Sequence, residues 1–298
     1  MKDYMDLEKL NIVKNRKGFI AALDQSGGST PKALENYGIM PDEYNGEEEM
    51  FDLVHKMRTR ILTSPSFTSE HILGSILFYK TMESKVNGKY TADYLWEDKN
   101  IISFLKVDKG LADEEDNVKV MKEIPDLEEQ LEEARNKHVF GTKMRSVIYG
   151  ANREGIEKVV KQQFEFAKVI CDNGLVPIIE PEVDINISDK EEAEEILKEV
   201  IVEQLNNWNK DDLIMFKFTI PTKENLYEDL YNNSCVVRIV ALSGGYEMNE
   251  ACQLLKKNNR MIASFSRALL QDLNANQTEE EFNNKLSTAI NKIYEASI

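Results

Sequence analysis

Short apolar segments alternate with longer amphipathic stretches along the whole chain. Each apolar segment is nearly continuous, which is typical of strands that are buried on both faces of a parallel sheet. We predict strands at residues 18–23, 72–78, 101–106, 139–144, 175–180, 213–218, 235–242 and 260–265. Because eight parallel strands joined by helices close into a barrel, the pattern predicts an α/β fold, a single (β/α)8 TIM barrel.

The stretches between these strands carry the signals of helices. Candidate helices occupy 46–57, 126–137, 154–173, 189–207, 222–231 and 246–257. Pro125, Gly174 and Asp189 stand at helix boundaries, where each residue type favours a helix start or end. An extra amphipathic helix, 278–296, follows the last strand. No linker or low-complexity segment interrupts this order, so we expect one domain spanning 1–298.

Composition limits the class of partner. The chain has 298 residues, of which 42% are hydrophobic, so it can bury a large core. Its formal net charge of −16 argues against nucleic acid or an anionic membrane as the main partner, because both attract basic surfaces. We expect a small-molecule partner, and an anionic one would require a locally basic pocket.

Localisation and cofactor use follow from what the sequence lacks. No apolar stretch approaches the roughly 20 residues of a membrane span, and segment 1–6 lacks the apolar core of a signal peptide. A cytoplasmic protein is therefore expected. The three cysteines and three histidines form no metal-binding or redox spacing. We expect reduced thiols, no metal and no cofactor.

Lys217 is the only charged residue in the apolar segment 213–220. A buried ammonium loses hydration unless it is paired, which favours the neutral amine that a Schiff base with a carbonyl substrate requires. A lysine near a strand end can instead extend its amine to water. The neighbouring strand ends favour the first interpretation, because Asp24, Lys106 and Glu180 occupy matching places. Carboxyl ends of parallel strands meet at the mouth of a barrel, where catalytic residues lie.

Charges two residues apart on a strand face the same way, which places Lys143 with Arg145, and Glu180 with Glu182, at the mouth. Lys143 shares the barrel level of Lys217, and nearby positive charge further favours a neutral amine. Glu180, on the neighbouring strand, is placed to shuttle the proton of Lys217. The two carboxylates indicate acid/base chemistry. Alternatively, they are counterions of the lysines, a role that fits Glu182 best.

Two glycine-containing turns are suited to phosphate. Ser26-Gly27-Gly28-Ser29-Thr30-Pro31 follows the first strand, and Ser243-Gly244-Gly245 follows the seventh. Each leads into a helix, so hydroxyl and backbone N–H donors converge at a helix N-terminus. Two such turns suggest a bisphosphate, although each alone is more typical of an ordinary turn.

Ser266 and Arg267 follow the eighth strand, next to the turn that follows the seventh. The planar guanidinium of Arg267 is suited to phosphate. Considered alone, Arg267 could equally pair with a surface carboxylate. Its position beside the glycine-containing turn favours a phosphate site.

These segments together resemble the class I fructose-1,6-bisphosphate aldolases, which form a Schiff base and use no metal. The resemblance covers nearly the whole chain in the expected order. Its most specific parts are Leu105-Lys106-Val107-Asp108-Lys109-Gly110 and Val176-Pro177-Ile178-Ile179-Glu180-Pro181-Glu182. Further matching segments are 21–29, 141–145, 241–245 and 264–269.

The resemblance implies reversible cleavage of fructose 1,6-bisphosphate to dihydroxyacetone phosphate and glyceraldehyde 3-phosphate, in glycolysis or gluconeogenesis. Lys217 would form the Schiff base, Glu180 would serve its formation and hydrolysis, and Asp24 would take the C4 hydroxyl proton during C3–C4 cleavage. Lys143 would stabilise charge around that step, and Glu182 belongs to the same catalytic set. The substrate-binding residues would be Ser26, Ser29, Lys106, Arg145, Ser243, Gly244, Gly245, Ser266 and Arg267.

The chain also departs from the longer animal members of this family. Met144 replaces their usual tryptophan, and the end at 294–298 lacks their long tail with its functional tyrosine. It looks more like the short bacterial branch, and its oligomeric state stays open. One alternative interpretation is a related lyase that acts on tagatose 1,6-bisphosphate or on a shorter ketose phosphate. The other is a barrel that serves as a binding or scaffold protein.

Overall fold

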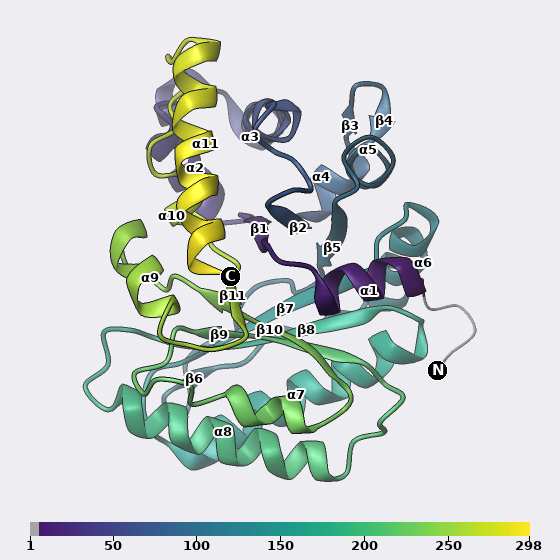
Figure 1. The fold of residues 1–298 in the computed structure, drawn as a ribbon, viewed down its shortest axis with the longest axis vertical. Helices are drawn as coiled ribbons and strands as arrows, with labels where there is room; N and C mark the ends of the chain where they lie inside the picture. The colour runs from purple at the N-terminus through teal and green to yellow at the C-terminus, as the bar shows by residue number, and fades with distance from the viewer. Residues whose placement is uncertain (1–5) are drawn as a thin grey trace.

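Eight parallel strands form the barrel in residues 6–298, the part of the chain that the computed structural model describes (Figure 1). Their bounds are β1 (Phe19–Leu23), β2 (Ile72–Leu77), β5 (Ile102–Lys106), β7 (Gly141–Ile148), β8 (Val176–Val183), β9 (Ile214–Thr219), β10 (Val236–Leu242) and β11 (Met261–Ala263). They neighbour one another in chain order. The backbone N–H of Ala22 donates to the carbonyl of Phe265 at 3.3 Å, across the gap between the first and last strands. The predicted TIM barrel is confirmed. The expectation about a signal peptide rests mainly on residues 1–5, which lie outside the described residues.

β7 and β8 are longer than the sequence predicted. Pairing between them continues from Gly141 opposite Val176 to Ile148 opposite Val183. A short strand, β6 (Val118–Lys119), adds to the outer end of β7 in the antiparallel direction. The extension carries residues 145 and 182 beyond the predicted strand ends, at the rim of the barrel.

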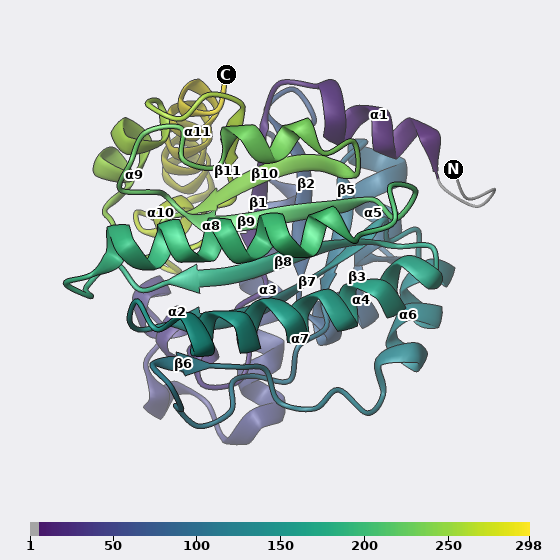
Figure 2. The ribbon, with the colours of Figure 1, turned by 90° about the horizontal axis from the view of Figure 1, so that it is seen from below.

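Helices cover the outside of the barrel. Their bounds are α1 (Leu7–Asn15), α2 (Ser29–Tyr37), α3 (Gly46–Thr63), α4 (Tyr79–Glu83), α5 (Thr91–Lys99), α6 (Leu127–Asn136), α7 (Arg153–Asp172), α8 (Lys190–Asn206), α9 (Met248–Leu255), α10 (Arg267–Leu270) and α11 (Glu279–Ala296). A small hairpin, β3 (Lys85–Val86) with β4 (Lys89–Tyr90), precedes α5. Figure 2 shows α7 and α8 side by side across the strands that they connect. The amphipathic helix expected after the last strand is present as α11.

The prediction of a helix at 222–231 is wrong. This segment forms turns and a 3-10 helix, Glu228–Asn232. Asn225 has a φ of 63°, a left-handed conformation that a right-handed helix cannot contain. Its backbone N–H donates to the side-chain oxygen of Asn258 at 2.8 Å. A tertiary contact therefore fixes the turn, and the amphipathic pattern did not reveal it.

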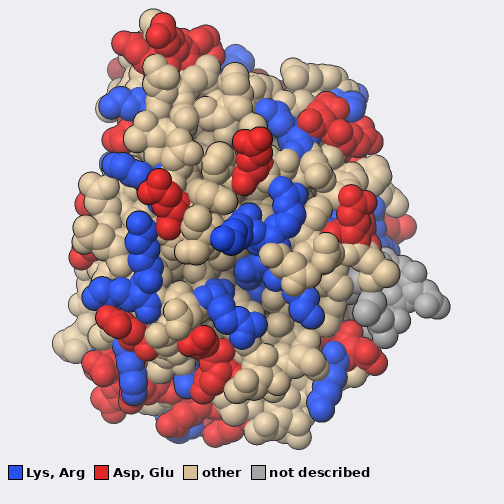
Figure 3. Space-filling model, in the orientation of Figure 1, with Lys and Arg blue, Asp and Glu red and all other residues tan. Residues whose placement is uncertain are grey.

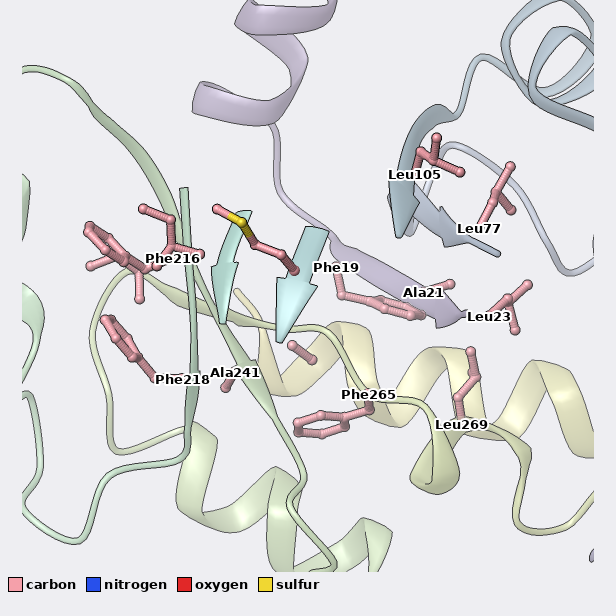
Figure 4. Close-up of a cluster of buried hydrophobic side chains, with 14 of the residues drawn as sticks. Phe19, Ala21, Leu23, Leu77, Leu105, Phe216, Phe218, Ala241, Phe265 and Leu269 are labelled. Atoms are coloured by element: carbon pink, nitrogen blue, oxygen red, sulfur yellow. The ribbon is translucent and has the colours of Figure 1, made fainter. Parts of the chain in front are cut away.

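The barrel has two apolar layers. Figure 4 shows part of the outer layer, which lies between strands and helices and includes Phe19 and Ala21 of β1 and Phe216 of β9. The alternate residues of the same strands belong to the interior cluster: Ile20, Ala22 and Met215 among them. α1 contributes Ile12 and Val13 to that interior cluster. Because side chains alternate along a strand, the charged residues that continue the interior row, Asp24 and Lys217, also face inward.

The surface of the described residues carries charges of both signs. Figure 3 shows acidic side chains around one face and a group of lysine and arginine side chains near its centre. Within residues 6–298, no helix has the length and apolarity needed to cross a membrane. The same residues contain no group of three or more histidine, cysteine, aspartate or glutamate side chains arranged to hold a metal ion.

Candidate active site

Four charged side chains from four strand ends meet inside the barrel. The Lys143 ammonium lies 2.8 Å from Oδ2 of Asp24 and 2.7 Å from Oε2 of Glu180. The Lys217 ammonium lies 3.1 Å from the other oxygen, Oε1, of Glu180. All four side chains are buried, with relative exposures of 8% or less. We call Asp24, Lys143, Glu180 and Lys217 the charged cluster.

Mutual attraction favours the charged forms of Asp24 and Lys143. Burial alone would raise the pKa of Asp24, but the ammonium groups of Lys143 and Lys217 outweigh it and hold that pKa well below its usual range. Burial would likewise lower the pKa of Lys143, yet Asp24 and Glu180 raise it well above its usual value. Lys143 is thus a fixed cation between two carboxylates. Lys217 shares one of those carboxylates, so a proton can pass between Lys217 and Glu180 over one hydrogen-bond length.

The backbone of Glu180 is held by an amide side chain that the sequence analysis did not single out. Gln163 of α7 accepts the Glu180 N–H at 2.9 Å and donates to the Glu180 carbonyl at 3.1 Å. It also donates to the hydroxyl of Ser146 at 3.0 Å, and it is fully buried. These bonds fix the strand end from which the Glu180 side chain reaches both lysines.

Arg145 and Glu182 pair with each other at the rim. Nε of Arg145 lies 2.5 Å from a carboxylate oxygen of Glu182. Burial opposes the charged guanidinium, but Glu182 raises the pKa of Arg145 well above its usual value. The structure does not bring Glu182 into ion-pair contact with the charged cluster among the described residues. Its geometry is that of a counterion to Arg145.

Lys106 lies beside Lys143 in the strand register but turns to a different partner. Its ammonium donates to the Asp108 carbonyl at 2.9 Å and to the Asp108 carboxylate at 2.7 Å. The same carboxylate accepts the Gly110 N–H at 3.2 Å. Asp108 was not among the predicted site residues, although it stands two positions after Lys106 within the segment that carries the family resemblance.

The Ser243-Gly244-Gly245 turn lies directly beside the end of β9. Gly244 and Gly245 have φ angles of 61° and 121°, which only glycine adopts readily. A side chain at Gly244 would sit 2.9 Å from Ile185 and 3.4 Å from Thr219, two residues after Lys217. The turn is therefore packed against the strand of Lys217, with its backbone uncovered by side chains of its own.

Arg267 reaches the same turn. Its Nη2 atom lies 3.6 Å from the place that a side chain at Gly245 would occupy. Within residues 6–298, Arg267 makes no ion pair, and the residue is exposed. Pairing with a surface carboxylate, the alternative left open by the sequence, is not seen in this part of the chain. The guanidinium is available to an anion that rests on the turn.

The turn after β1 is closed by its own serines. The Ser26 N–H donates to Oγ of Ser29 at 3.0 Å, and the Ser29 hydroxyl donates to the Ser26 carbonyl at 2.9 Å. α2 begins at Ser29, so Pro31 is the third helical residue. The N–H groups of Ser29 and Thr30 donate to the carbonyls of Ser26 and Gly27 at 3.2 Å and 3.1 Å, and Pro31 has no N–H, so these three positions offer no free backbone donor to an anion.

Comparison with known proteins identifies the family of this chain. A family model for class-I fructose-bisphosphate aldolase matches residues 7–224. The chain belongs to the class I fructose-bisphosphate aldolase family. Its coarse function is accordingly that of an aldolase-type lyase.

Solved structures share the fold of this aldolase-family chain. A fructose-bisphosphate aldolase from Plasmodium falciparum, solved in complex with TRAP and a small-molecule inhibitor, is 20% identical, with a TM-score of 0.79. That match covers 97% of this chain and 93% of the other. The Corynebacterium glutamicum protein Cgl0159 is 12% identical over 98% of this chain and 92% of the other, with a TM-score of 0.53. At these identities the comparison supports the barrel fold alone.

The sequence contains a signal that could have identified two buried polar residues near the site, Arg58 and Gln163. Arg58 is 1% exposed although it lies in the apolar stripe of α3, four residues after Val54. Gln163 likewise interrupts the stripe of α7 between Val160 and Phe164. A polar residue on the buried stripe of an amphipathic helix needs a hydrogen-bond partner, and here the partners belong to the site.

Proposed function

We propose that the protein cleaves fructose 1,6-bisphosphate reversibly to dihydroxyacetone phosphate and glyceraldehyde 3-phosphate through a Schiff base on Lys217, without a metal. The observation that carries the proposal is the contact of Lys217 with a carboxylate that also binds Lys143, inside a barrel of this family. As part of the same proposal, the chain acts as one cytoplasmic domain in glycolysis or gluconeogenesis. Family membership supports this assignment.

The charged cluster suits each step of this reaction. Nζ of Lys217 adds to the C2 carbonyl, and Glu180 passes the protons needed to lose water from the carbinolamine and form the protonated imine. Asp24 takes the C4 hydroxyl proton as the C3–C4 bond breaks, and the bonding electrons move into the imine, giving an enamine and a free aldehyde. Protonation of the enamine and hydrolysis then return the amine of Lys217.

Lys143 supports the cleavage step. It lies between Asp24 and Glu180, where charge is redistributed as the C4 proton moves. A fixed cation at that place stabilises the transition state without reorganisation. Glu182 is held by Arg145, and we propose that this pair shapes the rim and does not transfer protons.

The phosphate groups have two proposed subsites. Ser243, Gly244, Gly245, Ser266 and Arg267 would hold the phosphate of the dihydroxyacetone half, because this turn lies beside the strand of Lys217. The other phosphate would bind near the following residues: Ser26, Ser29, Lys106 and Arg145. The open turn at Gly27 and Gly28 supports this second subsite, because no atom lies within 4 Å of the place that a side chain would occupy at either glycine.

Borohydride reduction in the presence of dihydroxyacetone phosphate is expected to inactivate the enzyme and to add one triose phosphate to Lys217. The reason is that reduction traps the imine as a stable secondary amine. Peptide mass mapping locates the adduct. An adduct at Lys143 or Lys106 would overturn the assignment of Lys217, and the absence of any adduct would favour a binding or scaffold role. Parallel rates with fructose and tagatose bisphosphates test the sugar assignment.

Arg267→Lys is expected to weaken the use of fructose 1,6-bisphosphate much more than the use of unphosphorylated fructose. Lysine keeps the charge but loses the two-pronged contact with phosphate. Loss of one charge-assisted bond removes about 1.5–3 kcal/mol of binding. Steady-state kinetics with both substrates measure the effect. Equal losses with both substrates would mean that Arg267 supports the fold or the chemistry instead of phosphate binding.

A further inference from the structure

Gln25 connects two strand ends that carry different parts of the proposed site. It follows Asp24 directly and precedes the turn after β1. Its side-chain nitrogen Nε2 donates to the hydroxyl oxygen of Ser266 at 2.7 Å. Ser266 in turn directly precedes Arg267. The contact spans the junction between the first and last strands, where the backbone bond from Ala22 to Phe265 also lies.

Arg58 fixes which end of the Gln25 amide faces Ser266. Its Nη2 atom donates to the main-chain carbonyl of Gln25 and lies 3.4 Å from the side-chain oxygen Oε1. A guanidinium carries only donors, so it must face Oε1, and the reversed amide would oppose donor to donor. Nη1 donates to the hydroxyl of Thr81 at 2.6 Å, which anchors the guanidinium from the other side.

Arg58 is held in place for this contact. It is 1% exposed and makes no ion pair within the described residues, so its hydrogen bonds to neutral oxygens locate it. Burial lowers its pKa to about 10, against the opposing effect of Asp24, so the side chain remains a cation at neutral pH. An arginine buried without a carboxylate partner is costly, which points to a role beyond packing.

The direction of these bonds determines what Ser266 can do. A hydroxyl has one hydrogen to donate, and its oxygen already accepts from Gln25. The Ser266 hydrogen is therefore left for another acceptor. Arg267, the next residue, reaches the turn at Gly245.

We propose that Arg58 and Gln25 are positioning residues, which orient the Ser266 hydroxyl as a hydrogen-bond donor to the substrate phosphate that Arg267 binds. The inference rests on the proposed function for the identity of that phosphate. It assigns no direct contact with substrate to Arg58 or Gln25. It predicts that Gln25 acts on phosphate binding only through Ser266.

A double-mutant cycle tests this relay, the chain of hydrogen bonds from Arg58 through Gln25 to Ser266. Gln25→Met keeps the length of the side chain but donates nothing, and we expect it to raise the KM for fructose 1-phosphate roughly threefold to tenfold with little change in kcat. Gln25→Glu should raise that KM further, because a carboxylate would accept the Ser266 hydrogen and repel phosphate. In a Ser266→Ala background, Gln25→Met should have no additional effect. Additive losses in the double variant would overturn the relay.

A second measurement separates this inference from the proposed function. Calorimetric titration with inorganic phosphate reports anion binding whether or not the enzyme cleaves sugars, and the same cycle of variants should weaken it. If the wild type cleaves the sugar phosphate and both Gln25 variants keep its KM and its phosphate affinity, the relay alone is refuted. A wild-type protein with no cleavage and no borohydride adduct would refute the proposed function alone.

The experiment includes controls for correct folding of the variants. Circular dichroism and melting curves establish that the Gln25 variants, at a half-buried position, are folded. Thr63→Val removes a side-chain hydrogen bond of α3 that does not involve Arg58 or Gln25, and it is expected to leave the KM for fructose 1-phosphate within about twofold. An equal rise of KM in Thr63→Val would attribute the effect to general loosening of the region, against the proposal.

Discussion

Lys217→Met is expected to lower kcat/KM for fructose 1,6-bisphosphate by about 10⁵-fold or more, as the loss of an essential nucleophile does in other enzymes. The variant should still fold, because Glu180 keeps its contact with Lys143 at 2.7 Å and is not left as an unpaired buried charge. Lys217→Arg should be as inactive, because a guanidinium stays protonated and cannot form the imine. Aldehyde release measured in a coupled assay gives both rates.

Two further variants serve as controls for the Lys217→Met result. Glu180→Gln should slow turnover by about 10²–10⁴-fold while still allowing slow borohydride trapping, since only the proton carrier is lost. Lys158→Met removes an exposed lysine of α7 and should leave the rate unchanged. Substantial activity in Lys217→Met would show that the imine forms elsewhere or not at all.

The barrel was predictable because its strands are buried on both faces. Continuous apolar segments such as 213–218 indicate a strand in a parallel sheet, and the number of segments predicts closure. The charged cluster was predictable for a related reason. Charges such as Asp24 and Lys217 interrupt or end apolar strands, and barrel topology brings all carboxyl ends to one place.

The pairing of these charges was not predictable, because it depends on geometry across the barrel. Residue parity alone places Arg145 and Glu182 with the cluster, yet they neutralise each other at the rim. Lys106 similarly pairs with Asp108 instead of joining Lys143. The length of each side chain and the extension of β7 and β8 determine which charged residues pair. Neither can be inferred from hydrophobic periodicity.

Elements fixed by tertiary contacts were also missed. α1 was not among the predicted helices, and it contributes to the barrel interior through Ile12 and Val13. The segment at 222–231 has a helical pattern but is bent by the left-handed Asn225 and its contact with Asn258. Short-range preference is weak compared with such contacts.

Lys143→Met is expected to reduce both activity and stability. Removing one member of a buried ion pair typically costs about 3–5 kcal/mol, because its partners stay charged and desolvated. Here the partners are the Asp24 and Glu180 carboxylates, both buried. Urea unfolding at neutral pH should therefore show a marked loss, whereas Lys158→Met, at an exposed position, should show none that can be measured.

The stability loss in Lys143→Met should shrink as the pH falls. In the wild type, Lys143 and Lys217 lower the folded-state pKa of Asp24, so this carboxylate stabilises the fold above its unfolded pKa of roughly 4 and less below it. In the variant, burial still raises the pKa of Asp24 while the strongest opposing cation is gone, so we expect the folded state to favour a protonated carboxyl and acidification to stabilise the variant relative to the wild type. The free energies of unfolding of the two proteins should thus converge between pH 7 and pH 5. A difference that stays constant over this range would mean that Lys143 stabilises the barrel by packing, and that Asp24 does not depend on it to remain ionised.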